Sequence, residues 1–336
     1  MNIRTAIQEF LKFHEVNNAS PHTIENYRKG LVYFVGWLET TYAIYDTDNL
    51  RLEHLRGWVT YLRKAVGHHG KPLADGTVHQ YGVWLSIFCH WLEHEEVIEK
   101  PITTRFTLPK MEQKFIPTYT PEDVQKMLAA CEEGRRTRPH LHKALASRNR
   151  AIVSILIDTG IRRKELAGLR LCDVDRDMRV LLVHRKGNKW QQVPVSREGF
   201  KPLHEYLTKY RPVLAKEADR TIAFKEDAVF LTDNGEPLSI PGLSSLFVRI
   251  ARRSGIDDKK VSPHNCRRYM ATTQLAMGRS PLDVQRQMGH TTLTMTNRYA
   301  SLTIEQLQRS HEEYSPWRQR PSHDRGETDK SGYWDQ

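Results

Sequence analysis

The chain has 336 residues, which exceeds one typical domain and predicts two. Its hydrophobic share of 39% supports folded cores and excludes a disordered chain. The formal net charge of +11 favours a polyanionic partner, most often nucleic acid, with a merely basic soluble protein as the alternative on charge alone.

The cysteines and the hydropathy indicate the compartment. The four cysteines lie far apart without a CxxC pair, which argues against a disulfide scaffold or a zinc ribbon and fits a reducing environment. No apolar signal segment follows Met1, and no apolar run approaches the roughly 18 residues that a membrane span needs. We therefore expect a cytoplasmic protein with no membrane partner.

Helical periodicity dominates the first hundred residues. Ser20 followed by Pro21 is typical of a helix start, and apolar residues recur behind it every three or four positions. Similar patterns occur around Ile7 and over residues 52–66 and 76–97, so we predict a four-helix domain. The basic side chains between the apolar positions could follow a phosphate backbone or form an ordinary solvated exterior.

The helical pattern ends near residue 100, where prolines and alternating charge predict a linker. Thr120 and Pro121 then begin a new helix. We predict a helical domain over residues 1–104, a linker over 105–118, a second domain over 119–314 and a polar, disordered tail over 315–336.

Arg162 and Lys186 are the first candidate site residues of the second domain. An apolar helix ends at Gly160, so Arg162 lies in the turn beyond it and could present its guanidinium to a phosphate. Taken alone, Arg162 is better explained as a surface arginine paired with Glu165. Lys186 lies at the edge of a hairpin predicted over residues 180–195, where it could reach a phosphate, although most hairpin lysines are solvated.

Further candidates follow in a region predicted to be mostly helical, from residue 240 to 311, after a short strand predicted at 229–231. A helix that begins at Pro263 places His264 and Arg267 on one face, three residues apart. His290 follows the next helix in a turn, and Tyr299 lies nine residues beyond it. Tyr299 is either a nucleophile or a buried core ring.

In this order and spacing, the motifs resemble the catalytic domain of the tyrosine recombinase, or phage integrase, family. The matching segments span about residues 119 to 312: Thr159-Gly160-Ile161-Arg162 with Glu165, Lys186-Gly187-Asn188-Lys189, His264-x-x-Arg267, Gly289-His290 and Tyr299. The first hundred residues resemble, more loosely, the helical SAM-like core-binding domain of the family. The resemblance implies a mainly α fold with a small antiparallel β-sheet in the C-terminal domain: a helical N-terminal core-binding domain plus an α+β catalytic domain.

The resemblance also implies a catalytic set of cations, histidines and one tyrosine: Arg162, Lys186, His264, Arg267, His290 and Tyr299. The tyrosine would attack a DNA phosphodiester and form a 3′-phosphotyrosyl link, while the two arginines hold the non-bridging oxygens. Lys186 would be the general acid, His264 the base or hydrogen-bond partner of the tyrosine, and His290 a donor to the phosphate. No cofactor, metal or ATP is expected, because the covalent link conserves the bond energy.

Double-stranded DNA with a specific recombination site is the partner that the resemblance implies. It also implies a homo-tetramer on DNA, formed through a helix over residues 302–314, and possible accessory DNA-bending proteins; the helix could equally pack in cis. The implied activity is that of a site-specific recombinase or integrase, such as one carried by a mobile element. A type IB topoisomerase and a non-catalytic DNA-binding accessory protein are the alternatives.

Two assignments within the set have rivals. Arg268 stands where many family members carry a histidine, and Arg267 is chosen over it on the His-x-x-Arg spacing. Tyr269 and Tyr314 are rival nucleophiles, but Tyr299 has the expected offset from His290.

Overall fold

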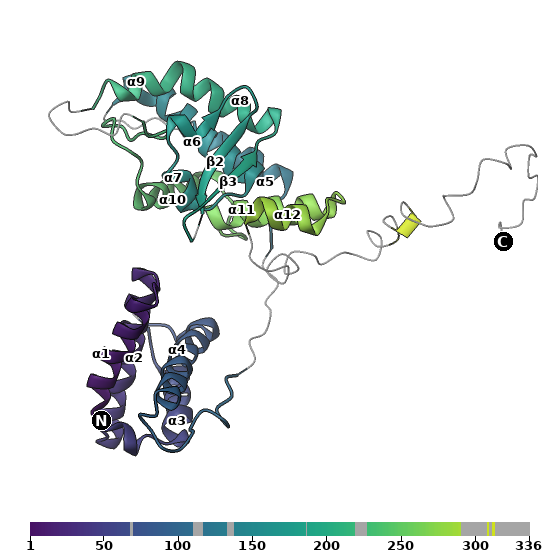
Figure 1. The fold of residues 1–336 in the computed structure, drawn as a ribbon. Helices are drawn as coiled ribbons and strands as arrows, with labels where there is room; N and C mark the ends of the chain where they lie inside the picture. Colours follow the sequence, from purple (N-terminus) through teal and green to yellow (C-terminus); the bar gives the residue numbers. More distant parts are fainter. Residues whose placement is uncertain are drawn as a thin grey trace, which may run out of the picture. The chain divides into compact units, whose positions relative to one another are not determined.

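The computed structural model describes residues 1–67, 70–109, 117–132, 138–185, 187–218, 227–289, 308 and 311–312. The chain divides into two compact units, Met1–Phe115 and Ile116–Gln336 (Figure 1). The fold class is as predicted, because the first unit is helical and the second combines helices with a small antiparallel sheet. None of the described helices is long and apolar enough to cross a membrane.

The first unit is built from four helices and a short 3-10 turn, as the periodicity predicts: α1 (Ile3–Val16), α2 (Pro21–Tyr42), η1 (Thr47–Asn49), α3 (Leu52–Lys64) and α4 (Asp75–His94). The predicted start of α2 is confirmed, since the Ser20 hydroxyl accepts a hydrogen bond from the Thr23 amide at 3.2 Å and Pro21 is the first helical residue.

Aromatic side chains fill the core of the first unit. Trp58 is fully buried, and its ring lies 5.5 Å from that of Phe34 in an edge-to-face arrangement. Phe10 and Phe88 pack in the same way at 5.4 Å and join α1 to α4. Edge-to-face contacts between rings add to the free energy that burial of their apolar surface provides.

The ends of the first unit differ from the periodic pattern. The helix predicted over residues 52–66 ends at Lys64, because Ala65 is extended and Val66, which is 65% exposed, bridges to Pro72. After α4 the chain stays attached to this unit: the Glu93 carboxylate accepts hydrogen bonds from the amides of Ile102 and Thr103, both at 2.7 Å.

The second unit holds the following elements: α5 (Pro121–Ala129), η2 (Pro139–Leu141), α6 (His142–Thr159), α7 (Arg163–Ala167), η3 (Leu171–Asp173), β1 (Val174–Asp175), β2 (Val180–Arg185), β3 (Lys189–Pro194), α8 (Arg197–Glu205), the π-helical turn η4 (Tyr206–Tyr210), α9 (Arg211–Ala215), α10 (Ile240–Ser254), α11 (Pro263–Ala276) and α12 (Pro281–Met288). Helix α6 is the centre of this unit, and α8 and α11 pack against it.

The sheet has the antiparallel order β1-β2-β3, and the predicted hairpin is confirmed. Arg185 pairs with Lys189 at its closed end, where Gly187 and Asn188 both have positive φ, as a tight hairpin turn requires. The strand predicted over residues 229–231 is wrong. Only isolated bridges form there, between Ala228, just before this segment, and Arg170, and between Leu231, at its end, and Pro237.

Candidate active site

Arg162 lies at the junction between α6 and α7. Gly160 ends α6 in the left-handed conformation, at φ 63°, and buried Ile161 anchors the turn. The Glu165 carboxylate accepts hydrogen bonds from the Arg162 amide and guanidinium, both at 2.8 Å. The Arg162 side chain is 38% exposed, so this fixed guanidinium is still open to a ligand.

Helix α11 supplies two further predicted residues. Ser262 caps its N-terminus and Pro263 is its first residue, which places His264 and Arg267 one turn apart. Arg267 is buried and donates to the Gly160 carbonyl at 2.5 Å and to the Met288 carbonyl at 2.7 Å. It therefore ties α11 to the end of α6 and to the end of α12.

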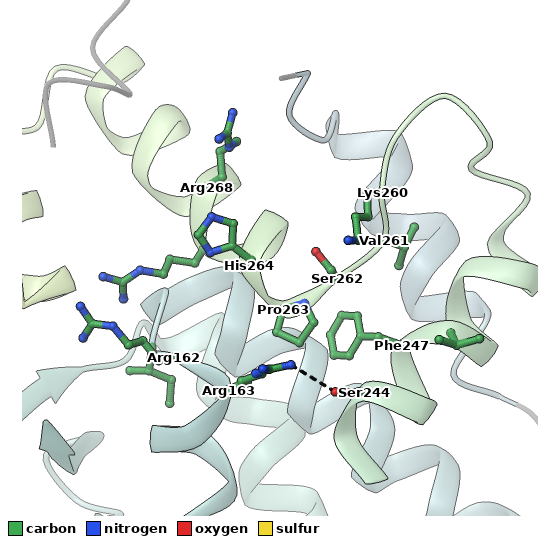
Figure 2. Close-up of a pocket in the computed structure, with 13 residues that line it drawn as sticks. Arg162, Arg163, Ser244, Phe247, Lys260, Val261, Ser262, Pro263, His264 and Arg268 are labelled. Atoms are coloured by element: carbon green, nitrogen blue, oxygen red, sulfur yellow. Dashed lines mark hydrogen bonds between the residues drawn. The ribbon is translucent and has the colours of Figure 1, made fainter. Parts of the chain in front are cut away.

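Arg162, His264 and Arg267 line a single cavity of about 770 Å³, although Arg162 and His264 lie 102 positions apart in the chain. The described lining residues include five Lys or Arg side chains and no Asp or Glu: Arg162, Arg163, Lys260, Arg267 and Arg268. Figure 2 shows Arg162 and Arg163 at the start of α7 and His264 at the start of α11, with Arg163 donating to the Ser244 hydroxyl at 3.4 Å. Such a cavity attracts an anion with several oxygens.

The electrostatic setting of His264 favours its neutral form. Desolvation lowers its pKa below the ordinary value of 6.5, and the cations Arg268, Arg267 and Lys260 lower it further. The imidazole is therefore unprotonated at pH 7, where it can accept a proton or a hydrogen bond. It becomes protonated in the free protein only when the pH falls below 6.5.

We expect Arg268→Gln to raise the pKa of His264 toward the ordinary value, because one neighbouring cation is lost. NMR titration of the histidine Cε1–H resonances in the folded protein measures this shift. Arg176→Gln, in the exposed turn between β1 and β2, is the control and should leave His264 unchanged. Equal titration curves for wild type and Arg268→Gln would contradict the electrostatic cause.

Glu165 supports two arginines, where the sequence suggested one. Its buried carboxylate also accepts from Arg185, at 3.3 Å to one oxygen and 3.2 Å to the other. Arg185 is itself buried, and desolvation lowers the pKa of its guanidinium. Arg185 is not among the residues that the sequence motifs predict. A signal was present, because Leu181, Val183 and Arg185 alternate on the inward face of β2.

We expect Glu165→Gln to lower the free energy of unfolding by about 3 kcal/mol, because it leaves the buried Arg185 without a counter-charge. Urea denaturation measures the loss. Asp173→Asn is the matched control: Asp173 is also buried, but its partner Arg170 is 48% exposed, so we expect only about 1 kcal/mol there. Equal losses of unfolding free energy in the two variants would show that the buried Glu165–Arg185 pair stabilises the protein no more than the partly exposed pair does.

The cavity wall that contains Lys260 is fastened by Tyr119. The Tyr119 hydroxyl donates to the Lys260 carbonyl and accepts from the Ser262 amide, both at 3.0 Å. Burial raises the pKa of Tyr119, so the hydroxyl keeps its proton. Lys259 adds an ion pair with Asp123 at 2.8 Å. Sequence reasoning missed Lys260 and Tyr119, and no local pattern indicates a contact over such a separation.

Three predicted site residues, Lys186, His290 and Tyr299, lie outside the described residues, as do Tyr314, most of the predicted 302–314 helix and the 315–336 tail. Arg185 and Gly289, the chain neighbours of Lys186 and His290, are described: Arg185 binds Glu165, and the Gly289 carbonyl accepts from Arg162. The rival Tyr269 is half-buried, and its ring lies 6.2 Å from Tyr119 against the core.

Solved structures with the same fold come from recombinases. The Tn1549 transposon integrase, in complex with transposon right end DNA, matches 94% of this chain and 99% of its own with a TM-score of 0.70 at 20% identity. The XerH site-specific recombinase, bound to a difH substrate, matches 93% of this chain and 84% of its own with a TM-score of 0.64 at 22% identity. The two units therefore have the fold of these two proteins.

Sequence relatives agree with the fold. A tyrosine recombinase XerD of Listeria innocua is 29% identical over 92% of this chain and 98% of the relative. A tyrosine recombinase XerC 2 of Ralstonia nicotianae is 32% identical over 90% and 83%. Residues 117–306 match the phage integrase family, and residues 7–71 match the phage integrase N-terminal SAM-like domain. The chain belongs to the phage integrase family and is a tyrosine-type site-specific DNA recombinase, as the sequence motifs predicted.

Proposed function

We propose that the protein cleaves and rejoins DNA strands at a specific site through a 3′-phosphotyrosyl intermediate, without metal or ATP. The observation that carries this proposal is the convergence of Arg162, His264 and Arg267 on one cation-lined cavity. A phosphodiester gains negative charge as it passes to a five-coordinate transition state, so fixed cations placed around it lower the barrier.

In the proposed reaction, the Tyr299 oxygen attacks the scissile phosphorus, and the bond from phosphorus to the 5′-oxygen breaks. Arg162 and Arg267 hold the non-bridging oxygens. His264, neutral at pH 7, takes the tyrosine proton, and Lys186 gives a proton to the departing 5′-oxygen. His290 donates to the phosphate. Attack by a 5′-hydroxyl on the phosphotyrosine reverses these steps and joins the strand.

The contacts of α11 support Arg267, and not Arg268, as the second activating arginine. Two carbonyl bonds fix the buried Arg267 guanidinium beside Gly160, next to the turn that holds Arg162. Figure 2 shows the Arg268 side chain directed away from Arg162. A donor that is already held in place lowers a barrier without a cost of ordering it.

We propose residues 1–104 as the core-binding domain, 105–118 as the linker and 119–314 as the catalytic domain, acting in the cytoplasm on double-stranded DNA. The Tn1549 integrase and XerH structures contain DNA, and six basic side chains on the first unit are exposed and could follow a phosphate backbone: Arg28, Lys29, Arg51, Arg56, Arg63 and Lys64. A tetramer on DNA through residues 302–314, and accessory DNA-bending proteins, complete the proposal.

Covalent trapping tests the proposed function. The protein is incubated with duplexes of random sequence beside a nick. Cleavage near the nick releases a short fragment that carries the 5′-hydroxyl needed for rejoining, so the protein stays covalently bound to the DNA. Recovery of complexes that survive hot detergent, followed by sequencing, shows both the adduct and the preferred site. Absence of any adduct would rule out strand cleavage and leave a non-catalytic accessory protein. Relaxation of supercoiled DNA that lacks the site would instead favour a type IB topoisomerase.

A further inference from the structure

Side chains from neighbouring elements hold the last turn of α12. The carbonyls of residues 286, 287, 288 and 289 each accept a side-chain hydrogen bond, and the donors are Gln191, Arg185, Arg267 and Arg162. Carbonyls at a helix C-terminus lack partners within the helix, and they form the negative end of its dipole. Arginines placed there satisfy both needs.

Arg185 makes the largest share of these contacts. It donates to the Gln287 carbonyl at 2.6 Å and to the Met288 carbonyl at 2.8 Å, and it also binds Glu165. Its buried guanidinium thus joins α12 to α7, and its backbone belongs to β2. Figure 1 shows the β2–β3 hairpin close to α12, as these bonds require.

Gly289 allows this guanidinium to lie against the turn. A Cβ atom at residue 289 would come within 2.7 to 2.8 Å of the Nε, Cδ and Cζ atoms of Arg185. Gly289 also has a φ of 63°, which favours glycine. The turn and the arginine therefore fit one another closely, and His290 is the next residue in the chain.

Strand packing alone does not explain an arginine at this position. Leu181 and Val183 occupy the equivalent inward positions of β2, and burying a charge costs desolvation that an apolar side chain avoids. The Nε atom of Arg185 is buried and has no hydrogen-bond partner among the residues that the structure describes, which adds to that cost. The hydrogen bonds by which the guanidinium holds the end of α12 offset this cost of burial.

We propose that Arg185 is a positioning residue for His290: by binding the carbonyls of Gln287 and Met288, it fixes the end of α12, which precedes this histidine in the chain. The inference rests on the proposed function, because it needs His290 to act on the phosphate. Arg185 touches no DNA in this role and acts through the backbone of the turn.

A double-mutant cycle on adduct formation tests the proposal, with the trapped nicked duplex as substrate. We expect Arg185→Met to slow the adduct roughly 10- to 100-fold, since a misplacement of about 1 Å can cost about 100-fold. In a protein that already carries His290→Ala, Arg185→Met should slow adduct formation less than about threefold, because the effects of two coupled residues are not additive. In a protein that carries Lys186→Ala, the effects of Lys186→Ala and Arg185→Met on the adduct rate should multiply. Arg185→Lys replaces the guanidinium, which can bind two carbonyls at once, with a single ammonium, so its adduct rate should lie between those of wild type and Arg185→Met.

Arg211→Met is the matched control, since Arg211 is also buried and donates twice to a carbonyl, that of Ala228. Arg211→Met and His290→Ala should act independently, so that their effects on the adduct rate multiply, whatever the size of the Arg211→Met effect. Amide hydrogen exchange gives a readout independent of activity: Arg185→Met, but not Arg211→Met, should speed exchange at Gly289. A wild-type adduct rate in Arg185→Met, or full multiplication with His290→Ala, would overturn the inference. A wild-type protein that forms no adduct would mean that the proposed function itself has failed.

Discussion

We expect Tyr299→Phe to abolish the covalent adduct, with a loss of at least about a thousandfold, or ~4 kcal/mol in the barrier. Phenylalanine keeps the ring and removes only the oxygen that attacks phosphorus. Binding of the recovered duplex should therefore stay at the wild-type level. Detergent-resistant adduct and gel-shift binding, measured on the same duplex, separate the two effects.

Tyr269→Phe and Tyr314→Phe are the controls for this assignment. The Tyr269 ring packs against the core beside Tyr119, so losing its hydroxyl should leave the adduct rate within about twofold of wild type. We expect the same of Tyr314→Phe. An adduct that survives in Tyr299→Phe and disappears in either control would move the nucleophile to that tyrosine.

Arg267→Ala should slow cleavage by about 10² to 10³-fold, because one preorganised donor to the transition state is lost. The Gly160 carbonyl also loses its Arg267 donor, and the Met288 carbonyl keeps only Arg185, so the free energy of unfolding should fall by about 1–3 kcal/mol. Single-turnover cleavage and thermal unfolding measure the two effects. Arg267→Lys keeps a charge without the fork and should recover stability more than rate.

Arg268→Ala is the comparison that decides between the adjacent arginines. Its side chain lines the cavity but is directed away from Arg162, so we expect a loss of less than about tenfold, from weaker anion attraction alone. A loss in Arg268→Ala larger than that in Arg267→Ala would reverse the assignment.

The parts of the site that could be predicted depend on local sequence. A glycine that ends an apolar helix predicts the turn at Arg162, and a capped proline start predicts that His264 and Arg267 share a face. The hairpin follows from Gly187 and Asn188 between apolar strands. Each of these signals lies within a few residues of the side chain that it positions, which is why propensity and spacing detect it.

Other parts depend on contacts between distant segments. Arg185 and Tyr119 matter because of carbonyls 102 and 141 residues away, and a linear pattern does not show such a contact. The strand predicted at residues 229–231 is wrong for a related reason. A short apolar run fits a strand or any other buried segment, and here its backbone bonds to Leu169 in place of a neighbouring strand.

Tyr119 sets where the second unit begins in practice. Helix α5 starts at Pro121, yet the Tyr119 hydroxyl, two residues earlier, forms hydrogen bonds that hold the loop leading into α11. A fragment cut at the helix start would keep every element of the second unit and still lose the support of Lys260 and Ser262. The shortest piece able to retain an intact anion cavity must therefore include Tyr119, so the beginning of the unit belongs to its active site.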